Sequence, residues 1–67
     1  MSLENELAQF EAELKQNEKQ LAKFESLDIT TMNQEQLEAR ERGIRMTKDD
    51  IKEIKEIIKE IKEEMVG

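Results

Sequence analysis

Carboxylates make up most of the side chains in this sequence that could do chemistry. Closely spaced pairs recur along the chain, such as Glu11 with Glu13 and Asp49 with Asp50. Two carboxylates act as general acid and base only when burial or a neighbouring charge separates their pKa values. These pairs lie in polar, strongly charged stretches, where both groups stay hydrated and ionised. We therefore interpret them as parts of solvated helix faces.

Other groups that support catalysis or metal binding are missing. The sequence has no histidine, cysteine or tyrosine, which excludes cysteine- or histidine-dependent nucleophilic catalysis and a Glu-x-x-His di-iron site. Asp49 and Asp50 lack the alternating acidic positions and the turn glycine of a calcium loop. There is no glycine-rich phosphate-binding loop. We expect a protein that is not an enzyme and binds no cofactor or metal ion.

A short basic cluster lies in the second half of the chain and consists of Arg40, Arg42, Arg45 and Lys48. Acidic residues flank it, the net charge of the chain is −6, and there is no tyrosine or tryptophan to stack on bases. We interpret the cluster as a solvated helix face, with Arg40 as a candidate member of a polar core layer. The charge pattern argues against nucleic acid as a partner.

The apolar residues that would position any functional surface follow a heptad repeat. In the N-terminal half, the spacing alternates between four and three over Leu3, Leu7, Phe10, Leu14, Asn17, Leu21 and Phe24. This spacing is typical of a coiled-coil seam, here with one polar member, Asn17. Ser2 is a suitable N-cap, with Glu4 and Glu6 near the positive end of the helix dipole. The pattern predicts a helix over residues 3–26.

The repeat ends in the stretch "SLDITTMN", where β-branched and short polar residues disfavour a helix. A new helix start follows. Asn33 and Gln36 have the spacing of a capping box, and Met32 and Leu37 that of a hydrophobic staple. The sequence predicts a turn over residues 27–33 and a second helix over residues 33–65.

Gly43 leaves open whether the second helix is continuous. A break is locally plausible, because Gly43 suits a helix C-terminus and Thr47 with Asp50 would form a capping box. The longer pattern opposes a break. Apolar residues continue in phase across the glycine at Leu37, Ile44, Ile51, Ile58 and Met65, with Ile54 and Ile61 between them. The sequence favours a continuous helix with its weakest stretch at residues 43–47, and a kink or break near Gly43 is the alternative.

Together these features predict an all-α fold, in which residues 1–67 form a single antiparallel helical-hairpin domain. Folding the chain about residue 30 pairs Leu3 with Ile58 and Phe24 with Leu37, with a slip of one layer left open. In this register Ile61, Met65 and Val66 extend beyond the first helix. A chain of 67 residues buries little core by itself, so we expect a coiled-coil or four-helix-bundle homo-oligomer, most simply a homodimer.

The expected oligomer or partner interface is the set of seam residues. It comprises Leu3, Leu7, Phe10, Leu14, Asn17, Leu21, Phe24, Leu37, Ile44, Ile51, Ile54, Ile57, Ile58, Ile61 and Met65.

Two functional hypotheses follow from this composition. The first is a scaffolding module for protein–protein interaction that self-associates through its seams. The second is a small acidic regulatory protein that binds another protein through the isoleucine-rich C-terminal helix and blocks, for example, a nucleic-acid-binding site. A membrane surface is disfavoured because residues 48–67 carry more acidic than basic groups. Without a signal-peptide pattern or a long apolar run, the expected location is cytoplasmic.

Overall fold

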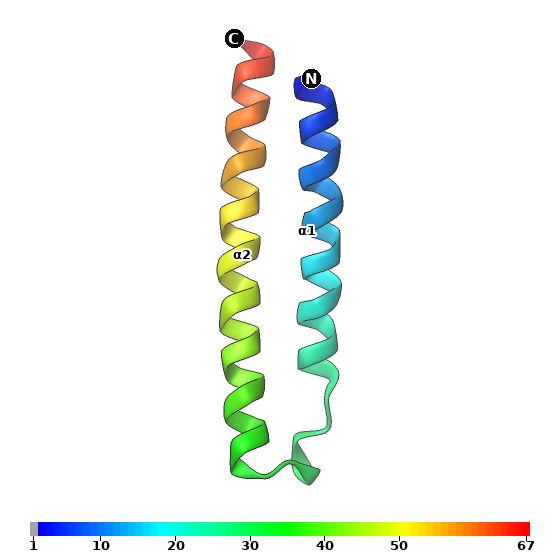
Figure 1. The fold of residues 1–67 in the computed structure, drawn as a ribbon, viewed down its shortest axis with the longest axis vertical. Helices are drawn as coiled ribbons and strands as arrows, with labels where there is room; N and C mark the ends of the chain where they lie inside the picture. The colour runs from blue at the N-terminus through cyan, green and yellow to red at the C-terminus, as the bar shows by residue number, and fades with distance from the viewer. Residues whose placement is uncertain (1) are drawn as a thin grey trace.

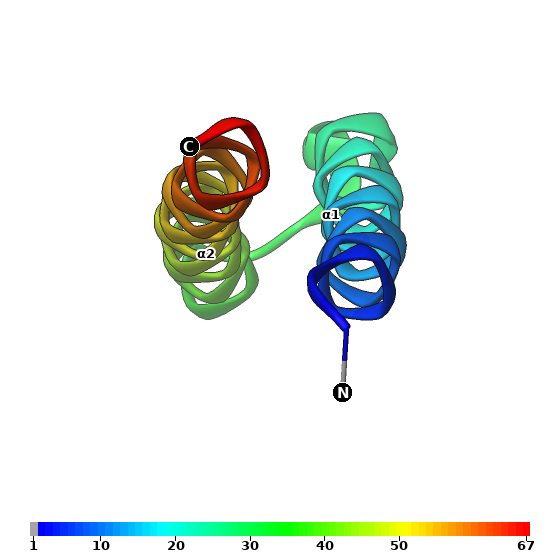
Figure 2. The ribbon, with the colours of Figure 1, turned by 90° about the horizontal axis from the view of Figure 1, so that it is seen from above.

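Two long helices form the fold in the computed structural model, which describes residues 2–67 (Figure 1). Helix α1 spans Leu3–Ser26 and helix α2 spans Gln34–Val66, with a short 3-10 turn, η1, at Ile29–Thr31. The helices run antiparallel, side by side in one layer measuring 51 × 15 × 14 Å (Figures 1 and 2). The predicted all-α helical hairpin is confirmed.

The helix starts follow the capping signals in the sequence. Ser2 Oγ accepts a hydrogen bond from the Asn5 N–H at 3.2 Å, which satisfies one of the free donors of the first turn of α1. Asn33 and Gln36 form the predicted capping box, with reciprocal hydrogen bonds of 2.9 and 3.0 Å. Asn33 is the extended cap residue itself, so α2 begins one residue later than predicted.

The connection between the helices is stabilised locally by Asp28. One oxygen of its carboxylate, Oδ1, accepts hydrogen bonds from the Thr30 hydroxyl at 2.6 Å and the Thr30 N–H at 3.0 Å. These two bonds, the one from the hydroxyl more than the one from the backbone, hold the pKa of Asp28 below its ordinary value of 3.8. Such a turn needs no glycine, because the aspartate side chain completes it.

Helix α2 continues through Gly43 without a break, as the longer heptad pattern indicated. No residue in the described part of the chain has the positive φ of a left-handed helix end. Thr47, the cap of the alternative arrangement, lies inside the helix, where its hydroxyl donates to the Gly43 carbonyl at 2.7 Å.

Two neighbouring pairs of residues, one near each end of α1, give the register of the helices. Phe24 lies against Gly43, and Leu3 borders the same hollow as Met65 at the open end. Equal steps along both helices then give the layers Leu3/Met65, Leu7/Ile61, Phe10/Ile58, Leu14/Ile54, Asn17/Ile51, Leu21/Thr47 and Phe24/Ile44. This register explains why Thr47, Ile54, Ile58 and Ile61 are buried, because each lies opposite a large apolar side chain of α1.

The register expected from the sequence was therefore wrong by one heptad, seven residues along α2. Leu3 lies opposite Met65 and not opposite Ile58. Ile61 does not overhang α1, because only 7% of its surface is exposed. The cause is the connection, which continues beyond the end of α1 before the chain reverses, so that α2 begins below the last turn of α1 (Figure 1).

Candidate interaction surface

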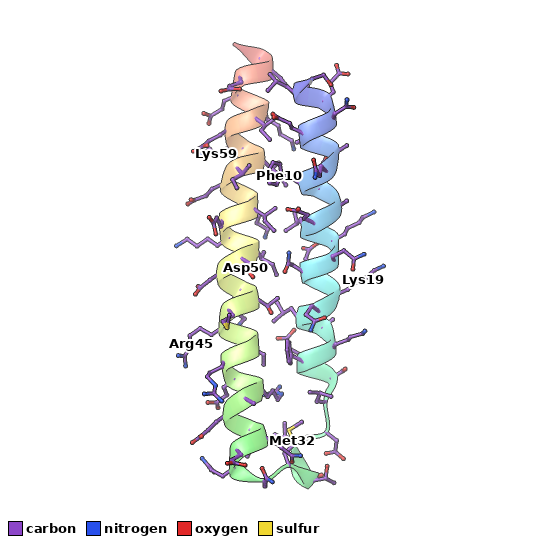
Figure 3. All side chains as sticks on the ribbon, in the orientation of Figure 1. Phe10, Lys19, Met32, Arg45, Asp50 and Lys59 are labelled. Atoms are coloured by element: carbon purple, nitrogen blue, oxygen red, sulfur yellow. The ribbon has the colours of Figure 1, made fainter. Side chains whose placement is uncertain are left out.

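The seam between the helices is covered only in part by the hairpin itself. Thr47, Ile54, Ile58 and Ile61 are buried, yet no described side chain is less than 2% exposed. The other seam residues are half-buried, apart from Met65, of which 43% is exposed. Figure 3 shows Phe10 pointing toward α2, while Lys19, Arg45 and Lys59 point away from the seam. Each seam residue is therefore covered on one side only, by the side chains of the facing helix.

Gly43 provides the space that the ring of Phe24 occupies. A Cβ atom built on Gly43 would lie 2.6 Å from Phe24 Cζ and 2.9 Å from Cε1, well inside van der Waals contact. The sequence identified this glycine only as a weak point of the helix. Its pairing with Phe24 depends on the register, which the heptad pattern leaves undetermined.

Arg40 joins the two helices through the only hydrogen bond among the described side chains that spans more than four residues of sequence. Its Nε donates to the Phe24 carbonyl at 2.9 Å, within the last turn of α1. A cation is favourable here, because the carbonyl groups of the last turn are the negative end of the helix dipole. Arg40 therefore belongs to the seam and not to the exposed basic surface, which consists of Arg42, Arg45 and Lys48.

We expect Arg40→Ala to lower the free energy of unfolding by about 1–2 kcal/mol, because a charge-assisted hydrogen bond to a helix end is lost. Urea denaturation followed by circular dichroism measures the change. Arg42→Ala is the control, because Arg42 is exposed and two residues away. Equal effects of the two substitutions would mean that the bond to Phe24 adds nothing.

Asn17 occupies the seam position predicted from the heptad spacing and is half-buried opposite Ile51. Its Nδ2 donates to the carbonyl of Glu13 in its own helix at 3.0 Å, and no described hydrogen bond joins it to α2. Thr47 is similarly bonded within its own helix. Both polar seam residues therefore donate a hydrogen bond within their own helix and none, among the described contacts, to the other helix.

Asn17→Leu is expected to raise the free energy of unfolding by about 1 kcal/mol, since a leucine opposite Ile51 adds apolar contact in a half-buried layer. It should also broaden the distribution of oligomers, because a polar seam residue restricts partner number. Thermal melts and light scattering report the two effects. Gln16→Leu, on the exposed surface of the same helix, should produce neither.

The acidic pairs lie on the surface of the hairpin. Glu11, Glu13, Asp49 and Asp50 are all exposed. Across residues 2–67, no group of three or more acidic side chains is close enough to hold a metal ion. Neither helix, over its described length, is long and apolar enough to cross a membrane.

Sequence and structure comparisons give no relative from which a function can be inferred. No family model matches the sequence, and no curated protein or solved structure matches it significantly. The surface properties of the hairpin are therefore the basis for any functional proposal.

Proposed function

We propose that this protein is a non-enzymatic interaction module that self-associates, with two hairpins forming a four-helix bundle. The proposal rests on the solvent-accessible surface of the hairpin, which is larger than that of a compact monomer of the same mass. A compact monomer of 7.9 kDa exposes about 4,400 Å². The hairpin exposes 5546 Å². The difference, about 1,100 Å², is larger than the roughly 800 Å² that each partner buries in a standard protein–protein interface.

The incomplete burial of the seam supports the same proposal. A two-helix hairpin covers one side of each apolar stripe, whereas a bundle core encloses the stripe from two sides. Leu7, Leu14, Ile44 and Ile51 are all half-buried in the single chain. Covering them with a second copy removes apolar surface from water at roughly 25 cal/mol per Å². Pairing of this kind makes the protein a small scaffold or assembly element.

Sedimentation equilibrium over a range of protein concentrations tests the proposal. We expect a species of twice the 7.9 kDa chain mass at tens of micromolar, dissociating on dilution. A folded monomer throughout this range would overturn self-association. It would favour the other hypothesis, an acidic regulator that covers its seam with a different protein.

A further inference from the structure

The two faces of the hairpin differ in their charged borders. In the heptads, Leu7 and Ile58 occupy a positions, and Phe10 and Ile61 occupy d positions. The hairpin has two broad faces, one on each side of the seam. The a residues turn toward one face, and the residues at e positions lie along its border. The d residues turn toward the other face, and the residues at g positions lie along its border. In an antiparallel pair the e positions of both helices lie along the same face.

We call the face bordered by the e positions the mixed-charge face. Its border on α1 is Glu4, Glu11, Glu18 and Glu25. Its border on α2 is Glu41, Lys48, Lys55 and Lys62. All of these side chains are exposed. One edge of this face is therefore uniformly negative, and the other is mostly positive.

We call the opposite face, bordered by the g positions, the acidic face. Glu6, Glu13 and Gln20 border it on α1, and Gly43, Asp50, Ile57 and Glu64 border it on α2. It has no basic border residue. Two copies of this face brought together would place like charges side by side in either orientation, which is unfavourable.

The apolar residues of the seam favour the mixed-charge face as well. The a positions that turn toward it are uninterrupted by polar residues at Leu7, Leu14, Leu21, Ile44, Ile51 and Ile58. The polar seam residues Asn17, Arg40 and Thr47 all occupy d positions and turn toward the acidic face.

Two hollows open along the α2 side of the mixed-charge face. One of about 650 Å³ lies at Ile58 between Lys55, Lys59 and Lys62. A second, of about 310 Å³, lies at Ile44 beside Arg45 and Lys48. Each is lined by one isoleucine, by two or three basic side chains and by a single glutamate, Glu63 in the first hollow and Glu41 in the second. Such a groove suits an amphipathic helix with acidic flanks, and α1 of another copy is such a helix.

We infer, given the proposed self-association, that two hairpins pair through their mixed-charge faces about a two-fold axis parallel to the helices. This axis places α1 of one copy over α2 of the other, antiparallel and in the same layers as within the hairpin. Glu11 then lies level with the interval between Lys55 and Lys59 of the second copy, and Glu18 with the interval between Lys48 and Lys52. A perpendicular axis would stack α1 on α1 and bring the two glutamate edges together.

Disulfide formation between single-cysteine chains tests this arrangement, because the protein has no cysteine of its own. A disulfide between Glu11→Cys and Lys55→Cys forms readily if α1 of one copy lies over α2 of the other across the mixed-charge faces. Glu11→Cys mixed with Glu18→Cys reports α1 over α1. Gln20→Cys mixed with Asp50→Cys reports pairing through the acidic faces. All five sites are exposed, and circular dichroism confirms that each variant is folded.

One chain of each mixture carries a size tag, so that the mixed disulfide separates on a non-reducing gel. For Glu11→Cys with Lys55→Cys we expect formation on the order of a hundredfold faster than in urea, because a dimer raises the effective concentration from about ten micromolar to about one millimolar. The other two mixtures should show little acceleration.

Preferred linkage of Gln20→Cys with Asp50→Cys would overturn the choice of face. Preferred linkage of Glu11→Cys with Glu18→Cys would overturn the choice of axis. Dimers in sedimentation with no accelerated linkage in any mixture would also refute the arrangement, while leaving self-association intact. A monomer in sedimentation would remove the proposed function and this inference together.

Discussion

Ile61→Glu is expected to unfold the hairpin. Ile61 is 7% exposed and lies opposite Leu7, so the substitution removes a buried apolar side chain and places a carboxylate in the seam. We expect a loss of about 3–4 kcal/mol in the free energy of unfolding, a large part of what a domain of this size has. Circular dichroism of the dilute protein should show most of the helix signal lost at 25 °C.

Met65→Glu is the matched control for this substitution. Met65 lies one turn further along the same helix, and 43% of its surface is exposed. The helix propensity of glutamate is close to that of both original residues, so a difference between the two variants reflects burial. We expect Met65→Glu to retain its helix content. If Ile61→Glu stayed folded as well, Ile61 would not be part of the intrachain core.

The second large effect concerns Gly43. In an open helix interior, Gly→Ala stabilises by about 1 kcal/mol through helix propensity. Here the added Cβ would lie 2.6 Å from Phe24 Cζ, so the ring must leave its place in the seam. Overpacking of this kind costs typically 1–3 kcal/mol, more than the propensity gain. We therefore expect Gly43→Ala to destabilise the protein by roughly 1 kcal/mol, measured by thermal and urea denaturation.

The same substitution in a Phe24→Leu background should have the opposite sign. Leucine lacks the ring atoms that meet the new Cβ, so only the gain in helix propensity remains. The double-mutant cycle isolates the contact between the two positions. A stabilising Gly43→Ala in the original background would show that the ring relaxes freely and that Gly43 is a simple helix position.

The sequence by itself determined the two helices, their caps and the seam residues. These features are local or periodic. Ser2, Asn33 and Gln36 form hydrogen bonds within one turn of chain, so their type and spacing are enough to predict the helix starts. The heptad pattern across Gly43 likewise predicted a continuous α2, because the apolar residues stay in phase across it.

Only the tertiary structure decided the register, and with it the roles of Ile61, Gly43 and Arg40. A heptad pattern is unchanged when one helix slides by seven residues, since apolar layers again meet mostly apolar layers. The alternation of residue types therefore cannot distinguish the expected pairing of Leu3 with Ile58 from the observed pairing with Met65. The path of the connection between Ser26 and Gln34, together with the fit of the Phe24 ring against Gly43, selects one of these degenerate registers.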